Sequence, residues 1–188
     1  MKNPLNKVGI QFGIILSIYY IIFNCALFFT DVTLFANKII GMVNIAFFII
    51  IGVITIFMAR RKAGGFVTFR EAFTPYFISI AIGITVKYLL LVVLFNVVDP
   101  SANDTLRQIM MEMQIETLTN LEIPQDQINE QIEAAKNLDQ FSPKSTLSMW
   151  AIHIVINSIL GFLLAAVFRN KSEFTQPTTT AEENKPQQ

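Results

Sequence analysis

The chain has 188 residues, of which 53% are hydrophobic and only 15% are charged, and its mean hydropathy is +0.50. A soluble domain usually carries about a quarter charged residues, so this composition is typical of a small membrane protein. Lys plus Arg and Asp plus Glu are equal at 14 each, which argues against a nucleic-acid partner, and one Cys and one His exclude a disulfide framework or a multi-Cys/His zinc site. We therefore expect a single membrane domain.

Four apolar segments are long enough to cross a bilayer, whose core of about 30 Å needs about 20 residues of helix. We predict spans at about residues 8–29, 39–58, 72–98 and 146–168. The first follows Lys2 and Lys7, as a signal peptide would. It is too long for the apolar region of a signal peptide and lacks a small-residue cleavage site, so we interpret it as a retained helix. Residues 1–170 are thus expected to form an all-α four-helix transmembrane bundle.

The positions of Lys and Arg predict how this bundle is oriented, because cytoplasmic loops are enriched in them. With the N-terminus inside, the inner side carries nine of these residues and the outer side four. The membrane-orienting group consists of Arg60, Arg61, Lys62, Arg70 and Arg169. We predict a multi-pass protein of the bacterial inner membrane with both termini in the cytoplasm. A specific site for anionic lipid remains an alternative role for the basic loop.

The connections differ in length. Residues 31–38 are predicted to form a short outer turn, and residues 59–71 an inner loop in which Gly64 and Gly65 supply turn geometry. Ser142 and Pro143 are typical of a helix start and precede the fourth span. Residues 171–188 are rich in Gln, Pro, Thr and Glu and are predicted to be a disordered cytoplasmic tail.

Residues 101–140 are predicted to form an amphipathic helical hairpin outside the membrane. Ser101 or Asn103 is the candidate cap of its first helix, and Pro124 suits the first turn of the second. The two apolar stripes comprise Leu106, Ile109, Met110, Met113 and Leu118, and Ile128, Ile132, Ala135 and Leu138. They are expected to pack on each other, with contact to the membrane surface or a partner as the alternatives.

Polar side chains inside the predicted spans are the candidate functional site. Given the topology, Lys87, His153, Asn157, Asn24 and Asn44 all lie in the outer half of the membrane. Small residues recur at helical spacing on the same helices (Gly9, Gly13, Gly41, Gly52, Gly83 and Gly161), which favours a close-packed bundle with these stripes inward. The five polar residues are then expected to converge. Two interpretations stay open: hydrogen-bonding between helices, or a ligand, ion or proton site.

Motifs for enzymatic chemistry are absent from the sequence. It contains no G-x-S-x-G, H-E-x-x-H, P-loop or G-x-G-x-x-G pattern, and a lone His supports no catalytic triad. Cys25 is expected to be an inert apolar residue within the first span. We therefore predict no enzyme activity, no metal site and no cofactor.

Several of these features together resemble a known bacterial family. They are four spans, the loop sequence Gly-Gly-Phe-Val-Thr-Phe-Arg-Glu-Ala-Phe at 64–73, Asp99-Pro100 after the third span, and Glu133-Ala134-Ala135 in the outer segment. Over roughly residues 5–170 the chain resembles the domain-of-unknown-function family 4199, found mainly in Bacteroidota. The resemblance implies an integral inner-membrane protein and supplies no catalytic residues.

The sequence thus leads to two functional hypotheses. The first is a non-enzymatic integral membrane protein whose outer hairpin contacts a partner or caps the bundle. The second is a small transporter or channel component with an outward-facing polar site within the membrane. The expected partners are the lipid bilayer and either another membrane or periplasmic protein or a second copy of the chain.

Overall fold

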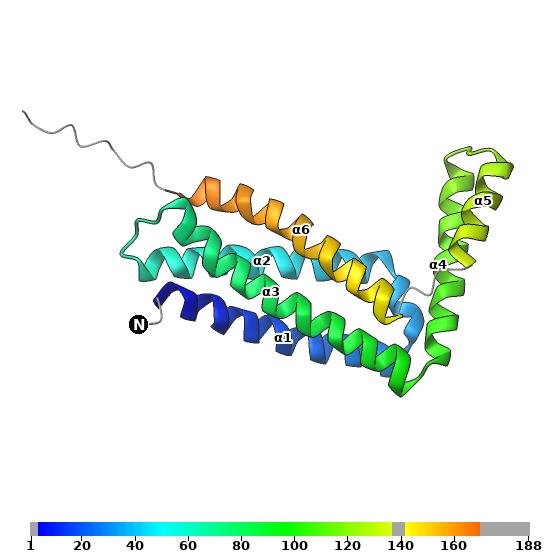
Figure 1. Cartoon of the computed structure of the whole chain (residues 1–188), viewed down its shortest axis with the longest axis horizontal. Coiled ribbons are helices and arrows are strands. Elements are labelled where there is room, and N and C mark those ends of the chain that lie inside the picture. Colours follow the sequence, from blue (N-terminus) through cyan, green and yellow to red (C-terminus); the bar gives the residue numbers. More distant parts are fainter. Residues whose placement is uncertain (1–3, 137–141, 170–188) are drawn as a thin grey trace, which may run out of the picture.

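The computed structural model describes residues 4–136 and 142–169, and this part of the chain is helical with no strand. Four long helices lie side by side: α1 (Pro4–Thr30), α2 (Lys38–Lys62), α3 (Phe69–Val93) and α6 (Pro143–Phe168) (Figure 1). A five-residue π-helix, η2 (Leu94–Val98), continues α3. All four are long and apolar enough to cross a membrane, which confirms the predicted four-span, all-α class.

Three of the four long helices begin before the predicted spans, at N-termini that are capped by polar side chains. The Asn37 side chain accepts hydrogen bonds from the backbone N–H groups at the start of α2, and Ser142 caps α6 through Ser145 N. Thr68 and Glu71 form a capping box that begins α3 at Phe69. The inner loop is therefore shorter than the predicted 59–71.

The loop between α2 and α3 turns at two glycines. Gly64 has φ +83° and Gly65 has φ +94°, a region that side chains other than hydrogen oppose. The Arg60 guanidinium donates a hydrogen bond from Nε to the Gly65 carbonyl at 2.8 Å. We call this end of the bundle, where Pro4, Lys62, Phe69 and Phe168 lie, the basic end, and the opposite one the α4 end (Figure 1).

Glycines let α1 pack closely on α3, which is central in the bundle and contacts α1, α2 and α6. A β-carbon on Gly9 would lie 2.6 Å from the Pro75 carbonyl oxygen, and one on Gly13 would lie 2.9 Å from Ile82 Cβ. From the other side, Gly83 of α3 receives the side chain of Leu16. The small-residue pattern therefore sets this close approach.

The short helix η1 (Val32–Ala36) replaces the simple outer turn between α1 and α2. Asp31 caps it by accepting a hydrogen bond from Thr33 N. The ring of Phe35 lies edge-on to Phe95 of η2, with centroids 5.5 Å apart. This packing covers the α4 end of the bundle with apolar side chains.

Two further helices, α4 (Ser101–Asn120) and α5 (Gln125–Lys136), lie beyond the α4 end and run across the bundle axis (Figure 1). The start of α4 is anchored, because Ala102 and Leu106 are buried in a cluster with Phe28 and Phe95. Ile128 of α5 is also buried, and α5 packs along α4. Met110, placed in the predicted stripe of α4, is exposed.

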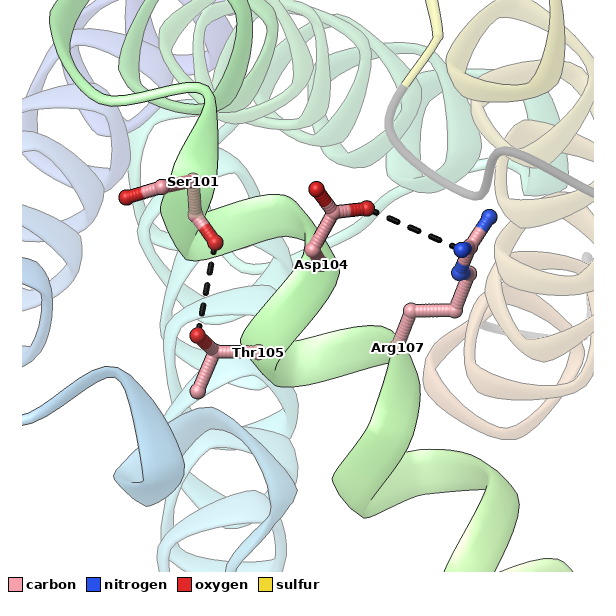
Figure 2. Close-up of polar contacts among 4 residues, drawn as sticks. All are labelled: Ser101, Asp104, Thr105 and Arg107. Carbon is pink, nitrogen blue, oxygen red and sulfur yellow. Dashed lines mark hydrogen bonds and ion pairs between the residues drawn. The ribbon is translucent and has the colours of Figure 1, made fainter.

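The cap of α4 differs from the prediction. The N-cap position is Pro100, which makes no side-chain cap bond, and not Ser101 or Asn103. Just before it, Asp99 Oδ1 accepts hydrogen bonds from Ser101 N at 3.0 Å and Ser101 Oγ at 2.5 Å. In the first turns, Thr105 donates to the Ser101 carbonyl at 3.3 Å and Arg107 pairs with Asp104 at 3.7 Å (Figure 2). Such an exposed ion pair contributes little to stability.

Parts of the sequence prediction lie outside the described residues. They are the tail at 171–188, the end of the predicted hairpin at 137–140 with Leu138, and the inner basic residues Lys2, Lys171 and Lys185.

Candidate functional site: a cavity in the α4 half of the bundle

A cavity of about 560 Å³ lies among α1, α2, α3 and α6. It occupies the half of the bundle nearer the α4 end. The structure brings all five predicted polar residues to its wall: Asn24 from α1, Asn44 from α2, Lys87 from α3, and His153 and Asn157 from α6. Residues that are far apart in the sequence thus share one site.

Lys87 is the only charged side chain among the described residues that line the cavity, and no Asp or Glu lines it with them. Its Nζ lies 5.3 Å from the centroid of the Tyr20 ring and 5.7 Å from that of Tyr88. Aromatic rings at this distance attract a cation through their negative faces. They carry no formal charge, so the ammonium has no ion-pair partner in the described part of the chain.

Hydrogen bonds between α3 and α6 hold the wall opposite α1 and α2. One joins the Tyr88 hydroxyl and His153 Nδ1. Trp150 donates from Nε1 to Thr85 Oγ1 at 3.0 Å, and the Tyr76 hydroxyl donates to the Asn157 carbonyl at 3.1 Å. His153 therefore has a partner that fixes its ring beside Lys87.

Among the described residues, the side chains of the three asparagines make no hydrogen bond to another helix. Asn24 donates from Nδ2 to the Tyr20 carbonyl and Asn157 donates from Nδ2 to the His153 carbonyl, both at 2.7 Å and both within their own helix. Within the described residues, the Asn44 side chain makes no hydrogen bond. Hydrogen bonding between helices therefore explains the presence of the His153 side chain inside the bundle, but not that of the asparagine side chains or Lys87.

The predicted polar cluster did not include the two tyrosines whose rings lie beside Lys87. Tyr20 lies one helical turn before Asn24 on the same side of α1, and Tyr88 follows Lys87 directly. Both spacings are visible in the sequence. The contact of Lys87 with the Tyr20 ring is not, because it depends on how α1 and α3 pack.

Below the cavity, toward the basic end, the bundle is tight. The Tyr76 ring, 1% exposed, lies between Gly52 of α2 and Gly161 of α6. Thr55, Ile56 and Ala165 near it are also buried. Gly41, in the first turn of α2 near the α4 end, has nothing within 4 Å of where a β-carbon would lie. The bundle is therefore close-packed in one half and open in the other.

The predicted orienting residues gather at the basic end. Arg60, Arg61 and Lys62 form the last turn of α2, Arg70 is in the first turn of α3, and Arg169 follows α6. Arg61 and Lys62 also border a hollow of about 350 Å³ whose other lining residues are Val8, Gln11, Phe12 and Met58. The anionic-lipid alternative for these residues therefore stays open.

Comparison with known proteins places the chain in a family. The sequence profile of a family described as a protein of unknown function, DUF4199, matches residues 11–170. The chain belongs to this family. No curated protein and no solved structure matches it. In this DUF4199 protein, the residues that line the cavity all lie within the matched region.

Proposed function

We propose that this DUF4199 protein is a non-enzymatic membrane protein that binds an anionic ligand in the cavity between its four long helices. The observation that supports this most directly is Lys87, a cation inside a membrane span whose ammonium borders the cavity with no carboxylate beside it. A charge in the membrane interior is costly unless it is paired, so such residues mark functional sites. A ligand that brings a negative charge would supply the missing partner.

The neighbouring groups suit an anion as well. The Lys87 ammonium has three N–H donors, and each asparagine amide has two. Asn24 and Asn157 each use one amide hydrogen within their own helix and keep the second, and Asn44 has both available among the described residues. Hydrogen bonds from such donors to an ionised acceptor are the strong ones. The site is therefore rich in donors, and the described residues that line it include no negatively charged group to repel an anion.

Thermal unfolding of the purified protein tests this proposal. We expect carboxylate or phosphate ligands to raise the melting temperature, because a ligand that binds only the folded state stabilises it. The Lys87→Gln variant should lose this shift. Lys144→Gln, which changes an exposed lysine on α6, should keep it. Equal shifts in the wild-type protein and Lys87→Gln would show that the anion acts elsewhere.

Binding is favoured over conduction through a single copy. The Tyr76 ring fills the space between Gly52 and Gly161 on the side of the cavity toward the basic end. A conducting path would have to pass this packed layer. A transporter or channel role therefore requires the Tyr76 layer to open or a second copy to contribute.

A second function is supported by the position of α4 and α5. Only the first turns of α4 are buried against the bundle, and α5 lies further out (Figure 1). We propose that this pair of helices contacts another membrane or periplasmic protein. Replacing residues 108–140 with a Gly/Ser linker keeps Leu106 in place and should remove specific crosslinks to that partner without lowering the melting temperature of the bundle. Unchanged crosslinks would contradict this role.

We also propose that the protein lies in the bacterial inner membrane with both termini in the cytoplasm. The gathering of basic residues at the end where α1 begins and α6 ends supports this orientation. A green fluorescent protein fused after residue 188 should fluoresce, and alkaline phosphatase at the same position should be inactive. Fusions within residues 121–124 should give the reverse. Active phosphatase after residue 188 would overturn the orientation.

A further inference from the structure

The wall of the cavity is divided into a polar and an apolar part. The polar groups cluster around Lys87, while most other lining side chains are aliphatic or aromatic, including Phe23, Phe48, Ile84 and Leu160. A small hydrated anion would leave this apolar part facing water or empty space. A molecule with one charged group and an apolar body would cover both parts.

The cavity also reaches the outer surface of the bundle. Ile45 of α2 and Ile156 of α6 both line it, yet they are 62% and 55% exposed. Ile49, one turn below Ile45 on α2, also lines it and is 38% exposed. These side chains belong to helices that span the membrane, so their exposed surface faces lipid. The cavity therefore opens sideways, between α2 and α6.

Apolar side chains also border the cavity at the α4 end. Leu27 and Phe35 border the cavity there, and Phe35 is packed against Phe95. On the opposite side the Tyr76 layer closes the bundle. The gap between α2 and α6 is thus the side on which a molecule with an apolar body has a continuous apolar path from the bilayer.

We propose that the ligand is an anionic amphiphile that enters from the bilayer between α2 and α6, places its carboxylate or phosphate on Lys87, and keeps its chain in the gap beside Ile45 and Ile156. This inference rests on the proposed anion-binding function and names the class of ligand and its route. Burying the chain against these side chains adds affinity in proportion to its length.

Two ligands with the same headgroup test this proposal: dodecyl phosphate and ethyl phosphate, measured by native mass spectrometry on the protein in a non-ionic detergent. We expect dodecyl phosphate to bind at least about tenfold more tightly, because each buried methylene adds affinity. Lys87→Gln should weaken its binding at least about tenfold, as expected for loss of a charge-assisted interaction.

A variant pair isolates the route. Ile156→Trp places a larger side chain at the opening and should reduce dodecyl phosphate binding. Ile152→Trp makes the same change at an exposed position one turn away on α6 that does not line the cavity, and it should leave binding unchanged. Melting temperatures of both variants verify that they are folded.

The outcomes separate this inference from the proposed function. Equal affinity for the two phosphates, still dependent on Lys87 and insensitive to Ile156→Trp, would overturn the amphiphile and leave anion binding standing. Failure of both phosphates and of the matching carboxylates, laurate and acetate, to bind through Lys87 would overturn both. A stable dimer that Ile156→Trp abolishes would also overturn the inference, because a second copy would then cover the opening.

Discussion

The ring of Tyr76 fills the space that a side chain at Gly161 would need. A β-carbon on Gly161 would lie 2.3 Å from Tyr76 Cε1 and 3.2 Å from Phe73 Cε2. On its other side, a β-carbon on Gly52 would lie 2.7 Å from Tyr76 Cε2. The two glycines thus allow α2 and α6 to close around one aromatic ring, which separates the open half of the bundle from the packed half.

Gly161→Ala should therefore destabilise the protein. The new methyl group meets ring atoms of a buried tyrosine whose other edge lies against Gly52, and overpacking of this kind costs about 1–3 kcal/mol. Thermal unfolding in detergent measures the effect. Gly41→Ala is the matched control, because its β-carbon meets nothing within 4 Å and alanine favours the helix. Equal melting temperatures for the two variants would contradict the packing described for Tyr76.

Lys87→Met should make the ligand-free protein more stable. An unpaired ammonium in a membrane span costs about 2.5–3.5 kcal/mol on insertion scales, and the two tyrosine rings offset about 1–2 kcal/mol of it. The expected gain is therefore about 0.5–2.5 kcal/mol, measured by unfolding without added ligand. Lys144→Met on the exposed start of α6 should change stability by less than about 0.5 kcal/mol. A marked loss of stability in Lys87→Met would instead assign Lys87 a structural role.

The sequence was sufficient to predict the four-helix bundle, but not that one half of it is closely packed and the other half holds a cavity. Long apolar runs bounded by charge define the four spans, because a bilayer permits few other structures. The convergence of the polar residues also follows, since one apolar environment drives them to the same interior. That Asn24 and Asn157 donate hydrogen bonds to carbonyls of their own helices could not be foreseen, because composition does not distinguish an i−4 carbonyl from an acceptor on a neighbouring helix.

The details that were wrong or missed depend on local geometry. The cap of α4 was assigned to Ser101 or Asn103, but the N-cap is Pro100, and Asp99 before it accepts the hydrogen bond from Ser101 N. Gly41 and Gly52 are both glycines of α2, and nothing in the sequence shows that Gly41 faces open space while Gly52 is in tight contact. Only the position of Tyr76 on α3 distinguishes them.

The hydrogen bond between Tyr88 and His153 should couple α3 and α6 energetically. Tyr88→Phe and His153→Leu each remove one partner, and each should cost about 1 kcal/mol. The double variant should cost less than the sum, with a coupling energy of about 0.6–1.7 kcal/mol, as for other hydrogen bonds between membrane helices. Tyr88→Phe with Ser158→Ala is the control pair and should be additive, since Ser158 bonds to the Ile154 carbonyl of its own helix. Additivity in both pairs would argue against the contact.

Asp99 should give the start of α4 a stability that depends on pH. A hydrogen bond from the Ser101 hydroxyl, aided by the backbone N–H groups of Ser101 and Ala102 and opposed by partial desolvation, lowers the pKa of Asp99 below its ordinary value of 3.8. A lowered pKa means that the ionised form is favoured by folding, so its contribution is present above pH 3.8 and is lost as the pH falls through the lower folded-state pKa.

Asp99→Asn should therefore melt at a lower temperature than the wild type at pH 7, and the difference should shrink as the pH falls below 3.8. Glu130→Gln, an exposed change on α5, should show no such convergence. If the difference in melting temperature between wild type and Asp99→Asn stays constant across this range, the negative charge of Asp99 does not stabilise the start of α4.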